Sequence, residues 1–197
     1  MKFERGPWPR KGTKVFDASG DWWHNACLNT MANATLAYAL GYKLAADAVV
    51  QHVEEHRRYQ DFLVYPVVFL YRHYIEIRLK EIVTQGSILL ASPKRAPKTH
   101  NLQNLWGHAR RTLEELSLGE PVEDSEAVEE LIGQFHEVDP SSTAFRYPRD
   151  TRGHGSVCGM QTVNLRHVAT LMKDSGAYLD AACDWIAEYL SRVDFGA

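Results

Sequence analysis

The segment from Tyr65 to Lys80 constrains the fold more than any other part of the sequence. At about 100° per residue, its apolar side chains fall on one side of a helix. Arg72 and Glu76 lie in the middle of that apolar stripe. A lone buried charge is costly, so two charges spaced i, i+4 on such a face should be paired and hydrogen-bonded. The stripe consists of Tyr65, Val68, Phe69, Ile75, Leu79 and Val83.

A later segment, residues 139–148, holds polar groups that could complete this pairing. Arg72 can donate to a carboxylate, while Glu76 can accept from a hydroxyl, a histidine or Arg146. Such a network perturbs the ionisation of its members, as an active site requires, but a structural network does the same. A structural role and a ligand-binding or catalytic role therefore both stay open. The predicted polar centre consists of Arg72, His73, Glu76, His100, Asp139, Ser142 and Arg146.

Most of the remaining chain has helical periodicity. The pattern favours an all-α fold, an antiparallel bundle of four to five helices. Gly86 is expected to end the second helix. Residues 1–27 predict an irregular N-terminal arm, and residues 28–197 predict a single helical bundle domain. The expected helices cover residues 28–58, 61–84, 102–116, 125–137 and 163–193.

One stretch before the last helix cannot be helical throughout. Prolines and glycines interrupt residues 139–160 repeatedly. The segments 145–147 and 156–158 could pair as a short hairpin around residues 151–155. We therefore expect a small irregular or hairpin insertion between the fourth and last helices.

Composition narrows the possible settings. The 197 residues are 45% hydrophobic, which is enough for a real core, and the net charge of −3 argues against a generally basic nucleic-acid binder. No apolar run reaches the roughly 18 residues that a membrane span needs, and the N-terminus lacks the apolar core of a signal peptide. The three cysteines have no metal-ligand spacing. We expect a cytoplasmic protein that does not associate with membranes.

Charge is distributed unevenly along the chain. Residues 94–111 carry five basic side chains and no acid, whereas residues 114–139 carry ten acids and no lysine or arginine. The basic stretch could hold RNA phosphates, although solvated loop and helix surfaces are the simpler explanation of it. The candidate RNA-binding residues are Lys94, Arg95, Lys98, Arg110 and Arg111.

The segment His52-Val-Glu-Glu-His56 has the form of an inverted zinc-protease signature. Arg57 and Arg58 follow it directly and would repel a cation, and a helix end favours histidine for other reasons. We therefore predict no metal site. No glycine-rich phosphate loop, dinucleotide fingerprint or hydrolase elbow is present, so no cofactor is expected.

Three strings resemble a group of uncharacterised bacterial helical proteins related to the HEPN superfamily. They are Leu70–Lys80, Thr99-His-Asn-Leu102 and Phe145-Arg-Tyr-Pro148. The resemblance covers about residues 60–190 and implies a small helical bundle. Many HEPN proteins are metal-independent ribonucleases of toxin–antitoxin and phage-defence systems that act as dimers. The resemblance thus implies RNA, a homodimer and an antitoxin or other protein partner.

The hallmark of those ribonucleases is an arginine, a polar residue and, a few residues later, a histidine. Arg149-Asp-Thr-Arg-Gly-His154 is similar to it. The resemblance implies that His154 transfers a proton at the ribose 2′-OH and that Arg149 stabilises charge on the phosphate. The superfamily places this motif on a helix, whereas the flanking glycines here favour a turn. The alternative function is a non-catalytic interaction or ligand-binding module whose Arg72/Glu76 network is architectural.

Overall fold

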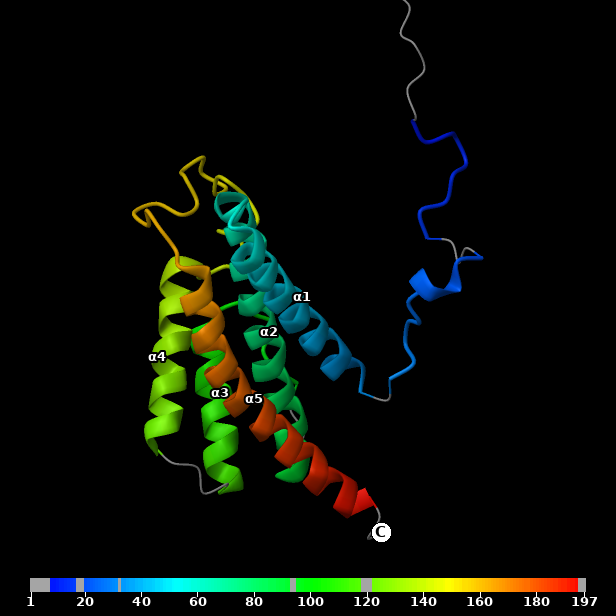
Figure 1. The fold of residues 1–197 in the computed structure, drawn as a ribbon. Coiled ribbons are helices and arrows are strands. Elements are labelled where there is room, and N and C mark those ends of the chain that lie inside the picture. Colours follow the sequence, from blue (N-terminus) through cyan, green and yellow to red (C-terminus); the bar gives the residue numbers. More distant parts are fainter. Residues whose placement is uncertain (1–7, 17–19, 32, 93–94, 118–121, 195–197) are drawn as a thin grey trace, which may run out of the picture. The chain divides into compact units, whose positions relative to one another are not determined.

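The computed structural model describes residues 8–16, 20–31, 33–92, 95–117 and 122–194 (Figure 1). The chain divides into two compact units, Met1–Ala32 and Asn33–Ala197. Within the first unit, a short 3-10 helix, η1 (Trp22–His24), stacks the rings of Trp22 and Trp23 with centroids 4.0 Å apart.

The second unit confirms the predicted all-α fold with an irregular insertion before the last helix. None of the helices in the described part of the chain is both long and apolar enough to cross a membrane. The helices are α1 (Ala34–His56), α2 (Gln60–Leu89), α3 (Leu102–Leu116), α4 (Val122–Val138) and α5 (Leu165–Asp194).

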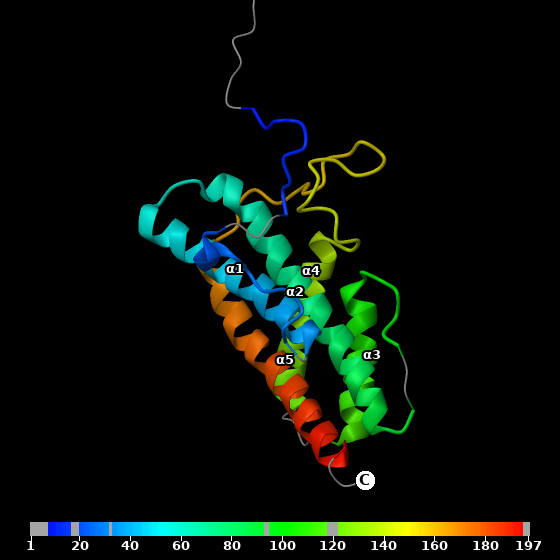
Figure 2. The same cartoon turned by 90° about the vertical axis from the view of Figure 1, so that its right-hand side faces the viewer.

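Helix α2 occupies the centre of the bundle. It packs against α1, α3 and α5, while α4 packs against α3 and α5. Helices α1 and α2 run antiparallel, as do α3 and α4, whereas α2 and α3 run in the same direction (Figures 1 and 2). Since α2 has neighbours on several sides, most of its side chains from Val67 to Ser87 are buried.

The two largest differences from the predicted helix boundaries have identifiable reasons. Helix α1 begins at Ala34 instead of residue 28, because the Asn33 side chain caps it by accepting a hydrogen bond from the Leu36 amide at 3.0 Å. Helix α2 continues past Gly86 to Leu89, so Gly86 does not end it. A Cβ at Gly86 would lie 2.5 Å from the Thr112 methyl. This glycine therefore permits a close contact between α2 and α3.

The insertion between α4 and α5 rests on its own small apolar cluster, formed by Val68, Ala144 and Phe145. In place of a hairpin, its described residues form a single antiparallel bridge between Arg149 and Gly155. The insertion begins at Asp139, which is buried, and the chain reverses direction in the exposed turn of residues 149–155.

Candidate functional site

Arg72 is buried on α2 and donates hydrogen bonds to Glu76 on the same helix, to His100 and to Asp139. Its side chain has 0% exposure. Nη1 donates to Glu76 Oε2 at 3.2 Å, Nη2 donates to the His100 carbonyl at 2.6 Å, and Nε donates to the Asp139 carbonyl at 3.1 Å. Burial lowers the pKa of Arg72, although the carboxylates of Asp139 and Glu76 oppose that shift. Arg72 thus joins α2 to the loop before α3 and to the end of α4.

Glu76 is the second buried charge of the predicted centre and accepts hydrogen bonds from Arg72, Lys80 and His100. Its Oε1 accepts from Lys80 Nζ at 2.7 Å and from His100 Nδ1 at 2.9 Å. Burial alone would raise the pKa of Glu76, but the hydrogen bonds and charges of Lys80 and His100 outweigh it and hold that pKa below its ordinary value. Of the partners proposed from the sequence, Glu76 therefore takes the histidine.

His100 combines a fixed ring with access to solvent. Its side chain is 62% exposed, while the Glu76 side chain that holds it is 2% exposed. Because a carboxylate can only accept, Nδ1 of His100 is the donor in this bond. The exposed part of the ring could contact a polar group of a ligand.

Asp139 is the first residue of the insertion, and its side chain stabilises the first turn through hydrogen bonds. Oδ1 accepts from the amides of Thr143 at 2.7 Å and Ala144 at 3.0 Å. Oδ2 faces Arg72 Nε at 3.5 Å, too far for a good hydrogen bond but close enough for an ion pair. Ser142 is buried with a positive φ of 63°. Asp139 therefore fixes the start of the insertion relative to α2.

Arg146 lies outside the Arg72–Glu76 network, although the sequence offered it as a donor to Glu76. Its Nε donates to the Ser142 carbonyl at 2.6 Å. Its guanidinium lies over the rings of Phe69 and Tyr147, 5.5 Å from each centroid. Arg146 is exposed and is held by aromatic contacts.

His73 contributes its ring to aromatic packing. It meets the Tyr42 ring edge-on with centroids 4.4 Å apart and stacks on Phe69 at 5.7 Å. Burial lowers the pKa of His73, although the charge of Glu76 opposes the shift. This histidine is therefore neutral at pH 7.

Arg149 and His154 lie together in an exposed turn of the insertion. The Asp150 amide donates to the His154 carbonyl at 2.8 Å, and Arg149 Nη1 donates to the Gly153 carbonyl at 2.8 Å. Asp150 Oδ1 accepts from the His154 amide at 2.8 Å, and its Oδ2 lies 3.4 Å from His154 Nδ1. The backbone bond from His154 is the main reason that the pKa of Asp150 is lowered. The motif lies in a turn and not on a helix.

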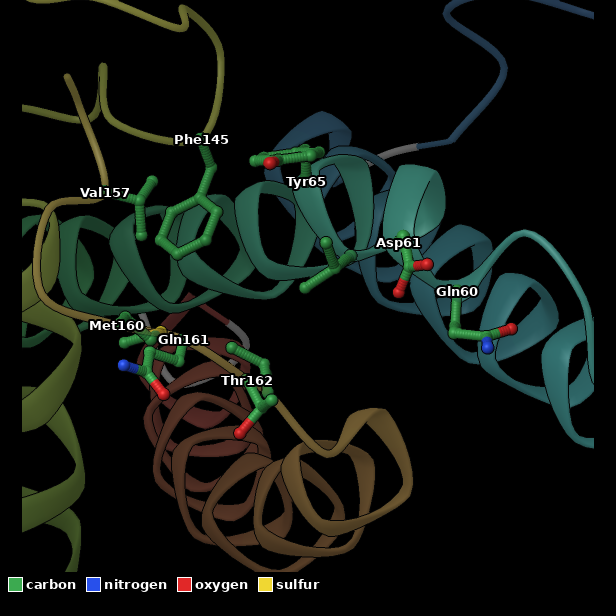
Figure 3. A pocket seen from close by; sticks show the side chains of 10 residues that line it. Gln60, Asp61, Tyr65, Phe145, Val157, Met160, Gln161 and Thr162 are labelled. Carbon is green, nitrogen blue, oxygen red and sulfur yellow. The ribbon is translucent and has the colours of Figure 1, made fainter.

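Two adjoining hollows lie between this insertion and the start of α2. One measures about 370 Å³ and the other about 580 Å³. Both are lined by Tyr65, Phe145 and Val157. Figure 3 shows Phe145 and Val157 extending from the insertion toward α2, with Tyr65 beside them. Sequence reasoning brought residues 139–148 to α2 through their polar groups, but it did not identify these hollows, because the aromatic and apolar residues that line both are far apart in the chain.

The basic residues of the 94–111 stretch are unequally available. Lys94 lies outside the described residues, while Arg95 and Lys98 are exposed in the loop before α3. Arg110 is paired with two acids, Glu114 and Glu129. Arg111 donates to the Gly107 carbonyl at 2.8 Å.

Helix α2 carries a second charged network that the sequence analysis missed. Arg78, 1% exposed, donates from Nε to Asp180 Oδ1 at 2.7 Å and from Nη1 to Glu81 Oε2 at 2.8 Å. The Tyr74 hydroxyl donates to the same Asp180 oxygen at 2.7 Å. The available signal was two further charges, Arg78 and Glu81, spaced i, i+3 within an otherwise apolar helix.

Among the described residues, no group of three or more histidine, cysteine, aspartate or glutamate side chains could hold a metal ion. His52 and His56 instead stack their rings with centroids 4.3 Å apart. No known protein family, curated protein or solved structure matches the chain.

Proposed function

We propose that the chain is a HEPN-like bacterial protein that acts in the cytoplasm and cuts RNA without a metal. The observation that carries this proposal is the exposed turn that holds Arg149, Asp150 and His154 together. The neighbouring residues Pro148 and Gly155 line the larger hollow, so the turn forms part of its rim. A cation, a histidine and a carboxylate that orients it are the groups that general acid–base cleavage requires.

In the proposed reaction, His154 takes the proton of a ribose 2′-OH. The 2′-oxygen bonds to the adjacent phosphorus as the bond from that phosphorus to the 5′-oxygen breaks. The departing 5′-oxygen takes a proton from solvent, and the products are a 2′,3′-cyclic phosphate and a free 5′-OH. Asp150 steadies the histidine, and Arg149 stabilises the charge that develops on the phosphate oxygens.

Among the described residues, the Arg149 guanidinium bonds only to the Gly153 carbonyl through Nη1, so its other donors can make such a contact. A homodimer that brings two turns together would place Arg149 of one copy near His154 of the other. The role would be that of a toxin or a phage-defence nuclease, with an antitoxin as the protein partner.

The experiment compares the wild type with three variants on a panel of single-stranded and structured RNAs in the presence of a chelator. We expect cleavage by the wild type and a rate about 10²–10⁴ lower for His154→Ala. Arg149→Ala should lose about 10²–10³. His167→Ala, which removes another exposed histidine, should cut at the wild-type rate. If the wild type cuts none of these RNAs, or His154→Ala cuts at full rate, the ribonuclease proposal fails.

A second candidate is a non-catalytic interaction or ligand-binding module. The observation that favours it is the closed network around Arg72, in which Glu76 and two backbone carbonyls satisfy the guanidinium internally. Under this proposal the buried charges stabilise the bundle, and no residue of the chain is catalytic. Binding of a ligand or protein without RNA cleavage would favour it.

A further inference from the structure

We propose that the hollow between α2 and the insertion is a binding site for an unstacked base of single-stranded RNA. The inference rests on the proposed function, because it names the substrate that would reach the Arg149–His154 turn. It concerns binding alone and requires no bond to break.

The first support is aromatic surface. Tyr65 on α2 is 48% exposed and Tyr147 on the insertion is 56% exposed, while Phe145 is 7% exposed and forms part of the wall. All three line the hollow of about 580 Å³. Ligand pockets commonly measure about 300–1,000 Å³, so the space suits a nucleoside. Rings of this kind stack with any base, because every base has a π-face.

The second support is a fixed cation at the same place. Arg146 lines the hollow, and its Nε is engaged by the Ser142 carbonyl at 2.6 Å. Within the part of the chain that the structure describes, its terminal nitrogens make no hydrogen bond, so they can contact a phosphate. The guanidinium is restrained by the Phe69 and Tyr147 rings, each 5.5 Å away, so binding sacrifices less side-chain freedom than a mobile arginine would lose.

The third support is the charge of the surrounding segment. Residues 140–163 contain three arginines, Arg146, Arg149 and Arg152, and one acid, Asp150. This local excess of positive charge contrasts with the net charge of −3 of the whole chain. Aromatic rings interleaved with arginines complement the bases and phosphates of a single strand. An acidic peptide would use the arginines but has no general need for the rings.

The geometry is also held in place before any ligand binds. Asp139 accepts from the Thr143 and Ala144 amides at 2.7 and 3.0 Å, and Phe145 packs on Val68. The rings and Arg146 are therefore fixed to α2. In a duplex the bases are stacked and paired, so their faces cannot enter this hollow. The site should select single strands.

The test measures fluorescence anisotropy of an end-labelled, unstructured 12-nucleotide RNA at low salt, with full-length His154→Ala protein so that the RNA stays intact. Tyr147→Ala should weaken binding about 5- to 150-fold, the range expected for loss of one stacked base. Tyr147→Phe should bind as well as its parent, because stacking needs the ring and not the hydroxyl. Tyr38→Ala, which removes a 63% exposed tyrosine from α1, is the matched control and should change nothing.

Charge is tested separately by the salt dependence of the same binding. Arg146→Met should reduce the slope of log K against log salt by about 0.7, the value for one phosphate contact on a single strand. Circular dichroism of each variant establishes that the fold is retained.

The outcomes separate this inference from the cleavage proposal. Equal affinity for single-stranded and duplex RNA, no binding at all, or an unchanged affinity in folded Tyr147→Ala would each overturn the base-binding site. Binding that depends on Tyr147, together with a wild type that never cuts RNA, would leave the site standing and remove the ribonuclease. Binding of an acidic peptide in preference to RNA would also reject the inference.

Discussion

Replacing Glu76 by alanine should destabilise the fold strongly, because it leaves Arg72 buried without its closest carboxylate. Arg72 is 0% exposed, and Glu76 Oε2 lies 3.2 Å from its Nη1. Asp139 Oδ2 stays 3.5 Å away, and two carbonyls still accept from the guanidinium. Removing one partner of a buried pair costs about 3–5 kcal/mol. We expect about 3 kcal/mol, at the lower end, because Asp139 compensates in part.

For a chain of this size, a loss of about 3 kcal/mol corresponds to a fall in Tm of about 6–12 °C. Urea unfolding followed by circular dichroism gives the free energy, and a thermal scan gives Tm. The matched control is Glu188→Ala, since Arg192–Glu188 has the same i, i+4 spacing at 2.5 Å but with side chains 63% and 58% exposed. It should cost about 0.3–0.5 kcal/mol. Equal losses in the two variants, or an unchanged Tm in Glu76→Ala, would refute the reasoning.

A double variant, Arg72→Met with Glu76→Leu, separates the contribution of the buried ion pair from that of the Arg72 hydrogen bonds to two backbone carbonyls. It removes both buried charges, and such replacements can be neutral. Here, however, the carbonyls of Asp139 and His100 would lose the donors that now satisfy them. We therefore expect the double variant to stay less stable than the wild type, by about 1–3 kcal/mol for each carbonyl left buried and unpaired. A double variant as stable as the wild type would show that these two carbonyl hydrogen bonds contribute nothing to stability.

Two further predictions concern packing and pH. Gly86→Ala should destabilise the protein by about 1–3 kcal/mol in urea unfolding, because its Cβ would lie 2.5 Å from Thr112 Cγ2. Gly41→Ala, with nothing within 4 Å, should instead stabilise it by up to about 1 kcal/mol. Thr112→Ser should relieve the Gly86→Ala defect, and equal effects of the two alanine variants would contradict this account. Because the pKa of His73 is lowered by burial, against the charge of Glu76, the unfolded chain binds a proton more readily and stability should fall as pH drops below about 6.5. His73→Phe should lose less stability than the wild type between pH 7 and pH 5, and an identical slope in both proteins would count against a neutral buried ring.

The pairing of Arg72 with Glu76 could be predicted from the sequence because two charges interrupt an otherwise apolar stripe. For the other partners of Arg72 and Glu76 the sequence offered only candidates. A histidine in a nearby loop can donate to Glu76, and an aspartate can accept from Arg72. Which ones meet depends on how the helices are arranged, with α2 and α3 running in the same direction. The sequence does not specify how the insertion lies on α2, so it could not place Arg146 over the Phe69 ring instead of on Glu76.

The Arg78 network escaped detection for a related reason. A helix buried on several sides has weak periodicity, so one stripe can be recognised while a second remains hidden. Asn33 illustrates the same limit, because it caps α1 through its side-chain oxygen and donates from Nδ2 to Glu81 at 2.9 Å. A cap can be recognised from local sequence, but a partner 48 residues away cannot. Gly86 was misassigned as a helix end because its role depends on α3.

The buried and exposed parts of the insertion have separable consequences. Asp139 holds the insertion through buried bonds, whereas Tyr147 and His154 lie at its surface and contribute little to the core. Substitutions at Tyr147 or His154 should therefore alter binding or cleavage without changing Tm. Asp139→Asn keeps an acceptor for the turn amides but removes the charge that faces Arg72. If it lowers both Tm and RNA affinity while His154→Ala lowers only cleavage, the buried network acts on function through the position of the insertion and not through chemistry of its own.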